Sequence, residues 1–366
     1  MKTPAFKPIA SIALMIALGL YQGVAAQQGP TGGTAAQPQS ETGQQHRAPQ
    51  SERTQPRATH KHPGMGTDQA TLPAPVPQGQ TSGWTPLMWA ADKGDVAMLD
   101  SILESGTDIN AQDDNGMTAL SHAAIGGHRE IVARLIKQGA QIDLADNWGA
   151  TPLMYAVKSS SVDTAKLLIK HGANVNRSLK KNHMSPLMMA AFRGDNAMIE
   201  LLLDSKADIE HVNSGGVNAL ITAIDKRHPD SATLLLKRGA KVKSVSSFGN
   251  SALHYAVSAD DVTLVRELVA KKAQVNATNM YGLTPAMHAS AGGKVAALEA
   301  LIDAGADINL IGGPSEGTAL IVAAGNNRVE AVNLLIRKGA AINARDKLGA
   351  TALIWAAGRQ QVDAVR

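Results

Sequence analysis

The chain has 366 residues, of which 44% are apolar, and it carries 35 basic against 31 acidic residues. This length and apolar content suffice for a sizeable core, while a net charge of +4 gives no electrostatic case for binding nucleic acid or an anionic membrane. The absence of cysteine excludes a disulfide framework, a cysteine nucleophile and a lipid-modified cysteine.

The first 26 residues are expected to be a secretory signal peptide. Lys2 and Lys7 form a basic start, residues 9–20 are apolar or small, and Val24-Ala25-Ala26 places small residues at the −3 and −1 positions of a cleavage site. The apolar stretch spans about 18 Å as a helix, less than the roughly 30 Å of a bilayer core. We expect cleavage after this motif, no stable membrane insertion of the product, and a periplasmic or secreted location. A buried or anchoring helix is the alternative.

Residues 27–80 are expected to form a disordered linker. The segment is rich in Gln, Pro, Gly, Thr and Ser and has almost no large apolar residue. It therefore buries too little surface to offset the entropy lost on ordering. His60-Lys61-His62, with His46 upstream, could be a metal-binding tract, but we interpret these histidines as part of a solvated linker.

The rest of the chain, residues 81–366, repeats at a nearly constant interval. A residue with a hydroxyl or amide side chain recurs with successive spacings of 33 or 34 residues. A constant period of this size predicts a solenoid, in which each unit buries its apolar face against its neighbours. The recurring lead residues are Thr85, Thr118, Thr151, Ser185, Asn218, Ser251, Thr284, Thr318 and Thr351.

Each unit is expected to be a pair of helices. The lead residues are of the types that cap helix N-termini, and a proline suited to the first helical position follows four of them. An adjacent apolar pair in the second helix is assigned to the core. The pairs are Ile102-Leu103, Leu135-Ile136, Leu168-Ile169, Leu202-Leu203, Leu235-Leu236, Leu268-Val269, Leu301-Ile302 and Leu335-Ile336.

The second helix is expected to end at a left-handed residue. Six units carry glycine there, which adopts this conformation without a Cβ clash. Lys206 and Lys272 replace the glycine in the other two units, at a cost of about 1–2 kcal/mol each. These two helix ends should therefore be locally less stable and less protected from hydrogen exchange.

These features resemble the ankyrin repeat. The resemblance rests on Gly-Trp-Thr-Pro-Leu-Met-Trp-Ala-Ala at 83–91 with Gly-Thr-Asp-Ile-Asn at 106–110, and it covers Thr81 to Arg366 in eight full repeats and a truncated ninth. It implies an all-α solenoid of stacked antiparallel helix pairs with β-hairpin finger loops. It also implies that a partner protein binds at the fingertips and on the concave helix face.

The sequence departs from the family pattern in two ways. The family usually has His three places after the lead residue; only His254 keeps it here, and the other units carry Met, Ser or Ile. We expect packing to replace most of the hydrogen bonds of that histidine. The two 34-residue spacings should each add one residue to a finger loop, near 178–183 and 311–316. Because the chain stops half way through the ninth unit, Ile354 and Trp355 are expected to lie in a truncated or frayed repeat.

Catalytic motifs are missing from the sequence, including Gly-x-Ser-x-Gly, His-Glu-x-x-His and the phosphate loop. The histidines mostly occupy equivalent repeat positions, such as His122 and His288, which indicates structural roles. We expect no enzymatic activity, no cofactor and no metal. Two alternatives stay open: the repeats could be the docking arm of an enzyme whose catalytic domain lies beyond Arg366, or the groove could bind a small ligand or a cell-wall polymer.

Two sets of residues are candidates for binding a protein partner. The first occupies the expected fingertips, three places before the lead residue, where exposed large apolar side chains commonly anchor interfaces; the alternative is that each ring packs on its own loop or the next. It comprises Trp148, Phe248, Tyr281 and Leu348.

The second candidate set lies at the ends of the first helices, on the expected concave face. Its cations could form a basic stripe that receives an acidic partner. The alternative is a set of scattered solvated charges, because Asp92 and Asp225 are next to two of these cations in the sequence. The set comprises Lys93, Lys158, Phe192, Arg193 and Lys226, with Arg359 in the equivalent place of the ninth unit. Trp89, Tyr155, Tyr255 and Trp355, one helical position away, are expected to be core.

Together these features predict an exported, monomeric scaffold without catalytic activity. It should recognise a protein partner through its fingertips and concave face.

Overall fold

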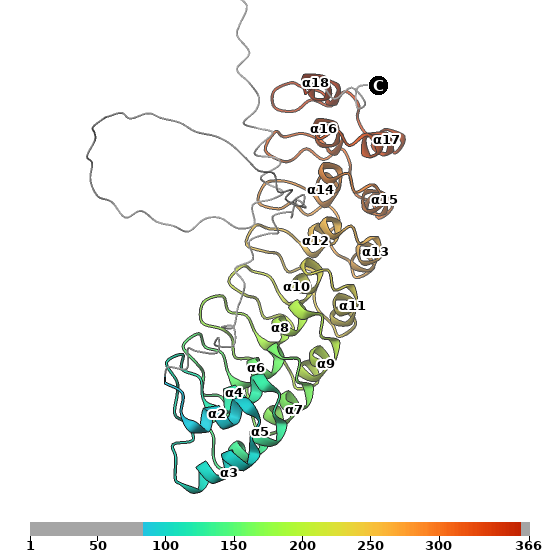
Figure 1. The fold of residues 1–366 in the computed structure, drawn as a ribbon. Helices are drawn as coiled ribbons and strands as arrows, with labels where there is room; N and C mark the ends of the chain where they lie inside the picture. Colours follow the sequence, from blue (N-terminus) through green and yellow to red (C-terminus); the bar gives the residue numbers. More distant parts are fainter. Residues whose placement is uncertain (1–82, 360–366) are drawn as a thin grey trace, which may run out of the picture. The chain divides into compact units, whose positions relative to one another are not determined.

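A computed structural model describes residues 83–359, which form one stack of helix pairs (Figure 1). The expected signal peptide and linker lie outside the described residues, as does the chain from residue 360 onward. The all-helical solenoid expected from the 33-residue period is confirmed. Each repeat contributes an inner helix, a short turn, an outer helix and a loop that returns to the next inner helix.

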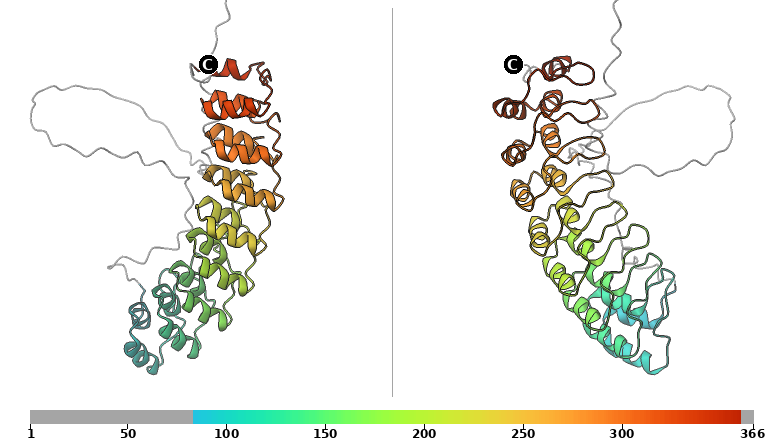
Figure 2. Two further views of the ribbon diagram at one scale, coloured as in Figure 1. Left: turned by 90° about the vertical axis from the view of Figure 1, so that its right-hand side faces the viewer. Right: turned by 180° about the vertical axis from the view of Figure 1, so that it is seen from behind.

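The helices form two parallel rows (Figure 2). Inner helices pack side by side along one row, and outer helices along the other. The inner row consists of α2 (Pro86–Lys93), α4 (Ala119–Gly126), α6 (Pro152–Lys158), α8 (Pro186–Arg193), α10 (Ala219–Asp225), α12 (Ala252–Ala259), α14 (Pro285–Gly292), α16 (Ala319–Gly325) and α18 (Ala352–Gly358). The outer row consists of α3 (Val96–Glu104), α5 (Arg129–Lys137), α7 (Val162–Lys170), α9 (Asn196–Asp204), α11 (Pro229–Lys237), α13 (Val262–Ala270), α15 (Val295–Asp303) and α17 (Val329–Arg337).

The lead residues cap the inner helices as expected. In eight of the nine inner helices the lead side chain accepts a hydrogen bond from the backbone N–H three residues later, which satisfies an otherwise unpaired donor. Ser251 differs, because its N–H and hydroxyl contact Nδ1 of His254 at 3.1 and 2.9 Å. The other ring nitrogen of His254 lies 3.0 Å from the carbonyl oxygen of Leu283 in the next repeat.

The residues that replace this histidine in the other repeats are buried, apart from the last one. Met88, for example, is 1% exposed and its sulfur also accepts a hydrogen bond from Thr85 N–H. Packing therefore replaces the histidine bonds, as the sequence indicated. The exception is Ile354 at 52% exposed, because no following repeat covers it in the described part of the chain.

In six of the eight apolar pairs of the outer helices, only one residue is core. The first member is buried in seven of the eight pairs, from Leu135 to Leu335. The second member is half-exposed or exposed, except in Leu235-Leu236, where both are buried. The assignment of whole pairs to the core was therefore wrong: adjacent helical residues point about 100° apart, and only the first faces the inner row.

The left-handed residues after the outer helices are confirmed. Six glycines there have φ between 79° and 97°, and Lys206 and Lys272 adopt the same region with φ of 66° and 63°. A lysine in this conformation retains the Cβ clash with its own backbone that glycine avoids.

The finger loops contain no regular strand within residues 83–359, so the β-hairpins expected there are not formed. Two isolated antiparallel bridges occur, at Val245–Ser251 and Gly312–Gly317. A typical loop is closed by one backbone hydrogen bond, as from Asp113 N–H to Met117 O at 2.9 Å. Other amides of this loop bond to a side chain, as those of Asn115 and Met117 do to Asp113, and Asn147 N–H bonds to Asn115 O of the neighbouring loop.

The extra residue of each 34-residue repeat lies inside the turn of its loop, as expected. The closing bond spans four residues in ordinary loops but five from Leu179 to Met184 and from Gly312 to Gly317. His183 and Glu316 take the left-handed position of these longer turns, with φ of 56° and 53°.

Successive loops are joined by backbone hydrogen bonds. Lys180 N–H donates to Trp148 O at 2.9 Å, and Met280 N–H donates to Phe248 O at 2.9 Å. The same bond joins most neighbouring loops, so the loops stack as the helices do. Loop side chains are therefore held at fixed positions relative to each other.

Candidate functional site

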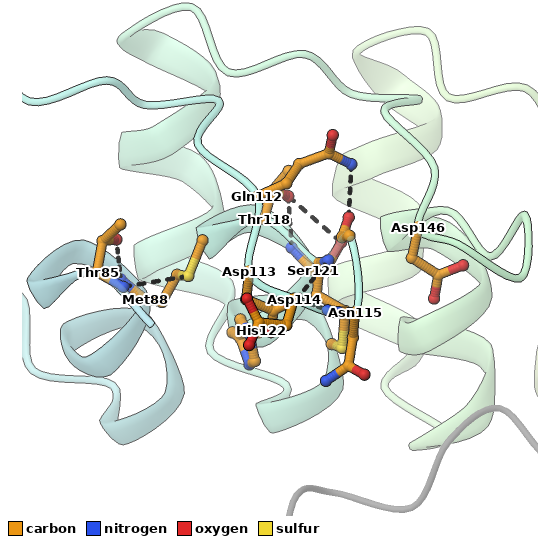
Figure 3. A network of polar contacts seen from close by, with 12 residues as sticks. Thr85, Met88, Gln112, Asp113, Asp114, Asn115, Thr118, Ser121, His122 and Asp146 are labelled. Carbon is orange, nitrogen blue, oxygen red and sulfur yellow. Dashed lines mark hydrogen bonds and ion pairs between the residues drawn. The ribbon is translucent and has the colours of Figure 1, made fainter. Parts of the chain in front are cut away.

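A buried carboxylate organises the base of the loop in the second repeat (Figure 3). Asp113 is 6% exposed, and its Oδ1 accepts backbone N–H bonds from Asn115 and Met117 at 2.9 and 2.8 Å. Its Oδ2 lies 3.2 Å from Nε2 of His122, which belongs to the following inner helix α4. The aspartate therefore fixes the loop to the helix that follows it.

Other repeats have the same arrangement, in which a loop aspartate is hydrogen-bonded to an inner-helix side chain nine residues later in the sequence. Tyr155 donates its hydroxyl to Asp146 at 2.5 Å, and the indole N–H of Trp355 donates to Asp346 at 2.7 Å. Where the inner-helix partner is absent, the loop residue can be an amide: Asn213 accepts the same two backbone bonds at 2.9 and 3.2 Å. The sequence analysis missed these pairs, although their constant nine-residue separation was visible.

Burial and hydrogen bonding shift the pKa values of these groups. Burial alone would raise the pKa of Asp113, but the bonds from His122 and from the backbone of Met117 and Asn115 outweigh it, so the pKa lies below its usual value. Burial and the bond to Asp146 raise the pKa of Tyr155. Asp113 and Tyr155 thus each have a hydrogen-bond partner within their own repeat, which suits a structural role.

Four aromatic residues occupy equivalent positions of their inner helices, and they differ in burial although all four were expected to be core. Tyr155 and Trp355 are buried and Tyr255 is half-buried, but Trp89 is 38% exposed. Trp89 lies in the first described repeat, where its ring contacts Trp84 edge-on with centroids 4.9 Å apart. The assignment of Trp89 to the core was therefore wrong, because the inner helix α2 has no neighbour on that side within residues 83–359.

The fingertip residues are not brought together. Trp148 and Leu348 are exposed at 39% and 59%, whereas Phe248 and Tyr281 are half-buried in their stacked loops. The loops of Phe248 and Tyr281 are neighbours, but those of Trp148 and Leu348 belong to repeats farther along the stack. Other exposed apolar loop residues were missed by sequence reasoning, namely Val212, Val245, Met280, Ile311 and Ile342.

The second candidate set, expected on the concave face, differs in this respect. Four of its residues, from three neighbouring inner helices, lie close together. We call Lys158, Phe192, Arg193 and Lys226 the inner-end cluster. Lys158 ends α6, Phe192 and Arg193 end α8, and Lys226 follows α10. The ammonium of Lys226 lies 5.0 Å from the centre of the Phe192 ring, a distance at which the ring face attracts a cation.

Further contacts fix the inner-end cluster. Arg193 donates from Nε to the hydroxyl of Ser160 at 3.3 Å. The carbonyl oxygen of Phe192 lies 3.1 Å from Nε2 of His228 in the next repeat. Asp225 forms an ion pair with Lys226 at 2.9 Å, and Asp195, two residues after Arg193, caps α9.

The cations of the cluster influence each other. Burial first, and then the nearby charge of Arg193, lower the pKa of Lys158. Phe192 is 37% exposed in the midst of these charges. The cluster thus combines a surplus of positive charge with an accessible aromatic ring.

The remaining members of the concave set lie elsewhere. Lys93 belongs to the first described repeat, where it pairs with Asp92 at 3.0 Å and lies 5.8 Å from the Trp89 ring centre. Arg359 follows α18, where its guanidinium lies 5.0 Å from the Trp355 ring and donates to Gly325 O. The cations of this set are therefore neighbours only in repeats three to five.

A hollow of about 440 Å³ adjoins the inner-end cluster. It lies between the turn after α10 and the turn after α12, and Arg227, His228, Asp260 and Asp261 contribute to its lining. Its two acidic groups already have partners: Asp261 caps α13, and Asp260 pairs with Lys294 at 3.4 Å. The hollow therefore offers no convergent set of unpaired polar groups for a small ligand.

A family model described as ankyrin repeats in three copies matches residues 87–178, 177–246, 239–312 and 310–366. The chain belongs to the ankyrin repeat family. No curated protein matches the chain. Among solved structures, it is similar to one chain of a complex between a predatory endopeptidase from Bdellovibrio bacteriovorus and an immunity protein, with 33% identity and a TM-score of 0.46; the match covers 49% of this chain and 94% of that one.

Within residues 83–359 there is no group of three or more side chains placed to hold a metal ion. None of the helices in that range is long and apolar enough to cross a bilayer. Both the inner-end cluster and the pair of Lys93 and Trp89 combine charge with an accessible aromatic side chain, and the cluster draws its residues from three neighbouring inner helices.

Proposed function

We propose that this chain is an exported ankyrin-repeat scaffold that binds a protein partner and catalyses no reaction. The inner-end cluster carries this proposal. Three cations and one ring converge from helices that a rigid stack holds in place, and preorganised charged and aromatic side chains favour protein interfaces. The expected signal peptide supports a periplasmic or secreted site of action, and we propose a monomer as the working form.

The loop of the fourth repeat adds positive charge to the same part of the stack. Arg177, Lys180 and Lys181 are exposed, and residues 174–184 contain no acidic side chain. A partner that spans the loops and the inner-helix ends of repeats three to five would therefore meet a basic surface. This favours a partner with an acidic face.

The fingertips form a second part of the proposed interface. Trp148 is an exposed ring on the loop of the third repeat, next to the loop that carries Lys180. Phe248 and Tyr281 are half-buried, so their contribution would combine contact with the partner and support of their own loops. Leu348 lies far along the stack and would contribute only to a long interface.

Affinity capture with matched variants tests the proposal. The tagged chain is incubated with cell-envelope extract, and bound proteins are quantified by mass spectrometry. A protein that binds the wild type should be lost with Lys158→Ala/Phe192→Ala/Arg193→Ala/Lys226→Ala and reduced with Trp148→Ala/Phe248→Ala/Tyr281→Ala. It should be retained by Lys137→Ala/Lys170→Ala/Lys237→Ala, which removes three exposed cations from the outer helices. Equal capture by the wild type and the quadruple variant would contradict the proposal.

A further inference from the structure

Neighbouring repeats are joined by a side-chain hydrogen bond between the segments that follow their outer helices. The residue 25 positions after one lead residue accepts a bond from the backbone N–H 23 positions after the next lead residue, as Glu210 accepts from Lys241 at 2.7 Å. We call this contact the junction bond. Six of the seven junctions within residues 83–359 have it, with the acceptors Asn110, Asp143, Asn176, Glu210, Asn276 and Asn309.

The junction between the segments after α11 and α13 lacks this bond. Lys243 occupies the acceptor position there, and an ammonium group cannot accept a hydrogen bond. The donor of this junction, Gln274 N–H, therefore has no hydrogen-bond partner within the described residues. Because Gln274 is exposed, an acceptor atom of a ligand can reach this N–H group from solvent.

A second acceptor is missing at the same place. In four other repeats the residue two positions before the junction acceptor accepts the N–H of that acceptor residue, at 2.9 to 3.0 Å; these residues are Asp108, Asn174, Asp208 and Asp307. Lys241 holds this position after α11, so the N–H of Lys243 also lacks an acceptor within residues 83–359. Positions that break a local rule of the fold are expected at functional sites.

Unpaired lysines surround the two N–H groups. Lys241 and Lys243 follow α11, and Lys271 and Lys272 precede Gln274; all four are exposed, and none forms an ion pair in the described part of the chain. Residues 231–259 and 268–298 contain no acidic side chain. We call these four lysines and the Gln274 N–H the junction site. It combines uncompensated positive charge with backbone hydrogen-bond donors.

A carboxylate is the ligand group that the intact junctions indicate. Asp143 accepts Asn174 N–H at 3.1 Å, and Glu210 accepts Lys241 N–H at 2.7 Å. A carboxylate from another molecule can therefore take the same place at Gln274 N–H. The lysines would strengthen its binding, because hydrogen bonds and ion pairs that involve charged groups are stronger than neutral ones.

Larger polyanions fit the junction site less well. Acidic residues flank it in the repeats on either side, namely Asp204 and Asp208 near the end of α9 and Asp303 and Asp307 near the end of α15. A bilayer or a nucleic acid duplex would also meet these acids, and like charges repel. Residues 237–247 and 270–280 contain no aromatic side chain on which unpaired bases could stack. A short acidic peptide would cover the lysines alone.

We propose that the junction site binds an acidic segment of a protein, with one carboxylate of that segment accepting the hydrogen bond of Gln274 N–H. This carboxylate takes the place that Glu210 and Asn276 hold at the junctions on either side. Lys241, Lys243 and the lysines after α13 hold its charge and that of neighbouring acids. The junction site follows the outer helices and shares no residue with the inner-end cluster, so this inference goes beyond the proposed function.

Two labelled octapeptides test it against the full chain by fluorescence anisotropy at low salt. One alternates four glutamates with glycines, and the other carries glutamine in place of each glutamate. The glutamate peptide should bind at least about tenfold more tightly than the glutamine peptide, and its affinity should fall as salt is added.

Lys243→Asn is the decisive variant, because asparagine accepts the junction bond in four other repeats, at positions such as Asn276. It should satisfy Gln274 N–H within the chain and weaken the glutamate peptide about tenfold, as the loss of one bond to a charged group does. Lys237→Asn removes the same charge at the exposed end of α11 and should change the affinity less than about twofold.

Hydrogen exchange of the Gln274 amide, followed by NMR, gives a second measurement. Exchange should slow when the glutamate peptide is added to the wild type, and it should already be slow in Lys243→Asn without peptide. These results would show that the same N–H group is satisfied by the ligand in one case and by the chain in the other.

Four outcomes would overturn the inference. They are equal affinities for the two peptides, unchanged binding in Lys243→Asn, a Gln274 amide that exchanges equally fast with and without peptide, and loss of binding in Phe192→Ala/Arg193→Ala/Lys226→Ala, which would place the peptide at the inner-end cluster. Phosphatidylglycerol vesicles or duplex DNA that bind through Lys243 more tightly than the peptide would assign the junction site to a polyanion instead and also overturn it.

Discussion

The hydroxyl of Tyr155 donates a hydrogen bond to Oδ2 of Asp146 at 2.5 Å, joining the inner helix α6 to the loop that precedes it. Both side chains are buried, at 0% and 2% exposed. The second carboxylate oxygen accepts the N–H bonds of Trp148 and Ala150. The geometry of the loop that carries Trp148 therefore depends on a residue in the helix row.

Tyr155→Phe should destabilise the chain by about 1–3 kcal/mol, because it leaves a buried carboxylate oxygen without its partner. Urea unfolding monitored by circular dichroism measures the change. Tyr281→Phe is the matched control, since its hydroxyl makes no hydrogen bond within residues 83–359, and it should change stability by less than about 0.5 kcal/mol. Equal effects of the two substitutions would mean that the Asp146 bond contributes nothing.

Acid should destabilise the chain through His288. Burial, and then the neighbouring charge of His254, lower the pKa of His288 to about 4, and its Nδ1 is enclosed without a hydrogen-bond partner in the described structure. An unfolded histidine has a pKa of about 6.5. Between these values the unfolded chain binds a proton that the folded chain does not, so stability falls as pH drops from about 6.5 to 4, by up to about 3 kcal/mol.

His288→Val should reduce this pH dependence, since Val322 occupies the equivalent position of the next repeat. The measurement compares unfolding free energies at neutral pH and near pH 5 for the variant and the wild type. His171→Gln, at an exposed position, is the control and should leave the slope unchanged. A wild-type slope that persists in His288→Val would assign the acid sensitivity to other groups.

Lys206→Gly and Lys272→Gly should each stabilise the chain by about 1 kcal/mol. Both lysines have positive φ, and a Cβ at the equivalent Gly139 would meet no atom within 4 Å, so the cost comes from the backbone conformation alone. Chemical denaturation measures the gain, and amide exchange should slow at the ends of α9 and α13. Gly139→Lys should cost a similar amount; a destabilising effect of either lysine-to-glycine change would contradict the account.

Gly194→Ala should cost more than Gly139→Ala, although both glycines have positive φ. A Cβ at Gly194 would lie 2.5 Å from Nδ1 of His228, whereas Gly139 has open space. The His228 ring must then move, which weakens its bond to Phe192 O. We expect a difference of about 1–2 kcal/mol in unfolding free energy; equal losses would show that the ring adapts freely.

The sequence predicted the features that recur in every repeat. Lead residues such as Thr85 cap their helices, and Lys206 is left-handed, because capping and chirality act within a few residues. The half-burial of Phe248 could not be predicted in this way, since it depends on how neighbouring loops stack through bonds such as Met280 N–H to Phe248 O.

The candidate surface was only partly predictable. The sequence placed Lys158, Arg193 and Lys226 near one face, but it also included Lys93, whose repeat lies farther along the stack. The approach of Lys226 to the Phe192 ring depends on side-chain conformation across two repeats. Repeat period alone does not determine such a contact.

Hydrogen–deuterium exchange on the chain with and without its captured partner tests most directly whether the inner-helix ends bind. Binding should slow exchange at the ends of α6, α8 and α10, around residues 158–160, 192–194 and 225–227, while the outer helices α7, α9 and α11 keep their free rates. Protection confined to the outer helices, with no change at the inner ends, would contradict the account.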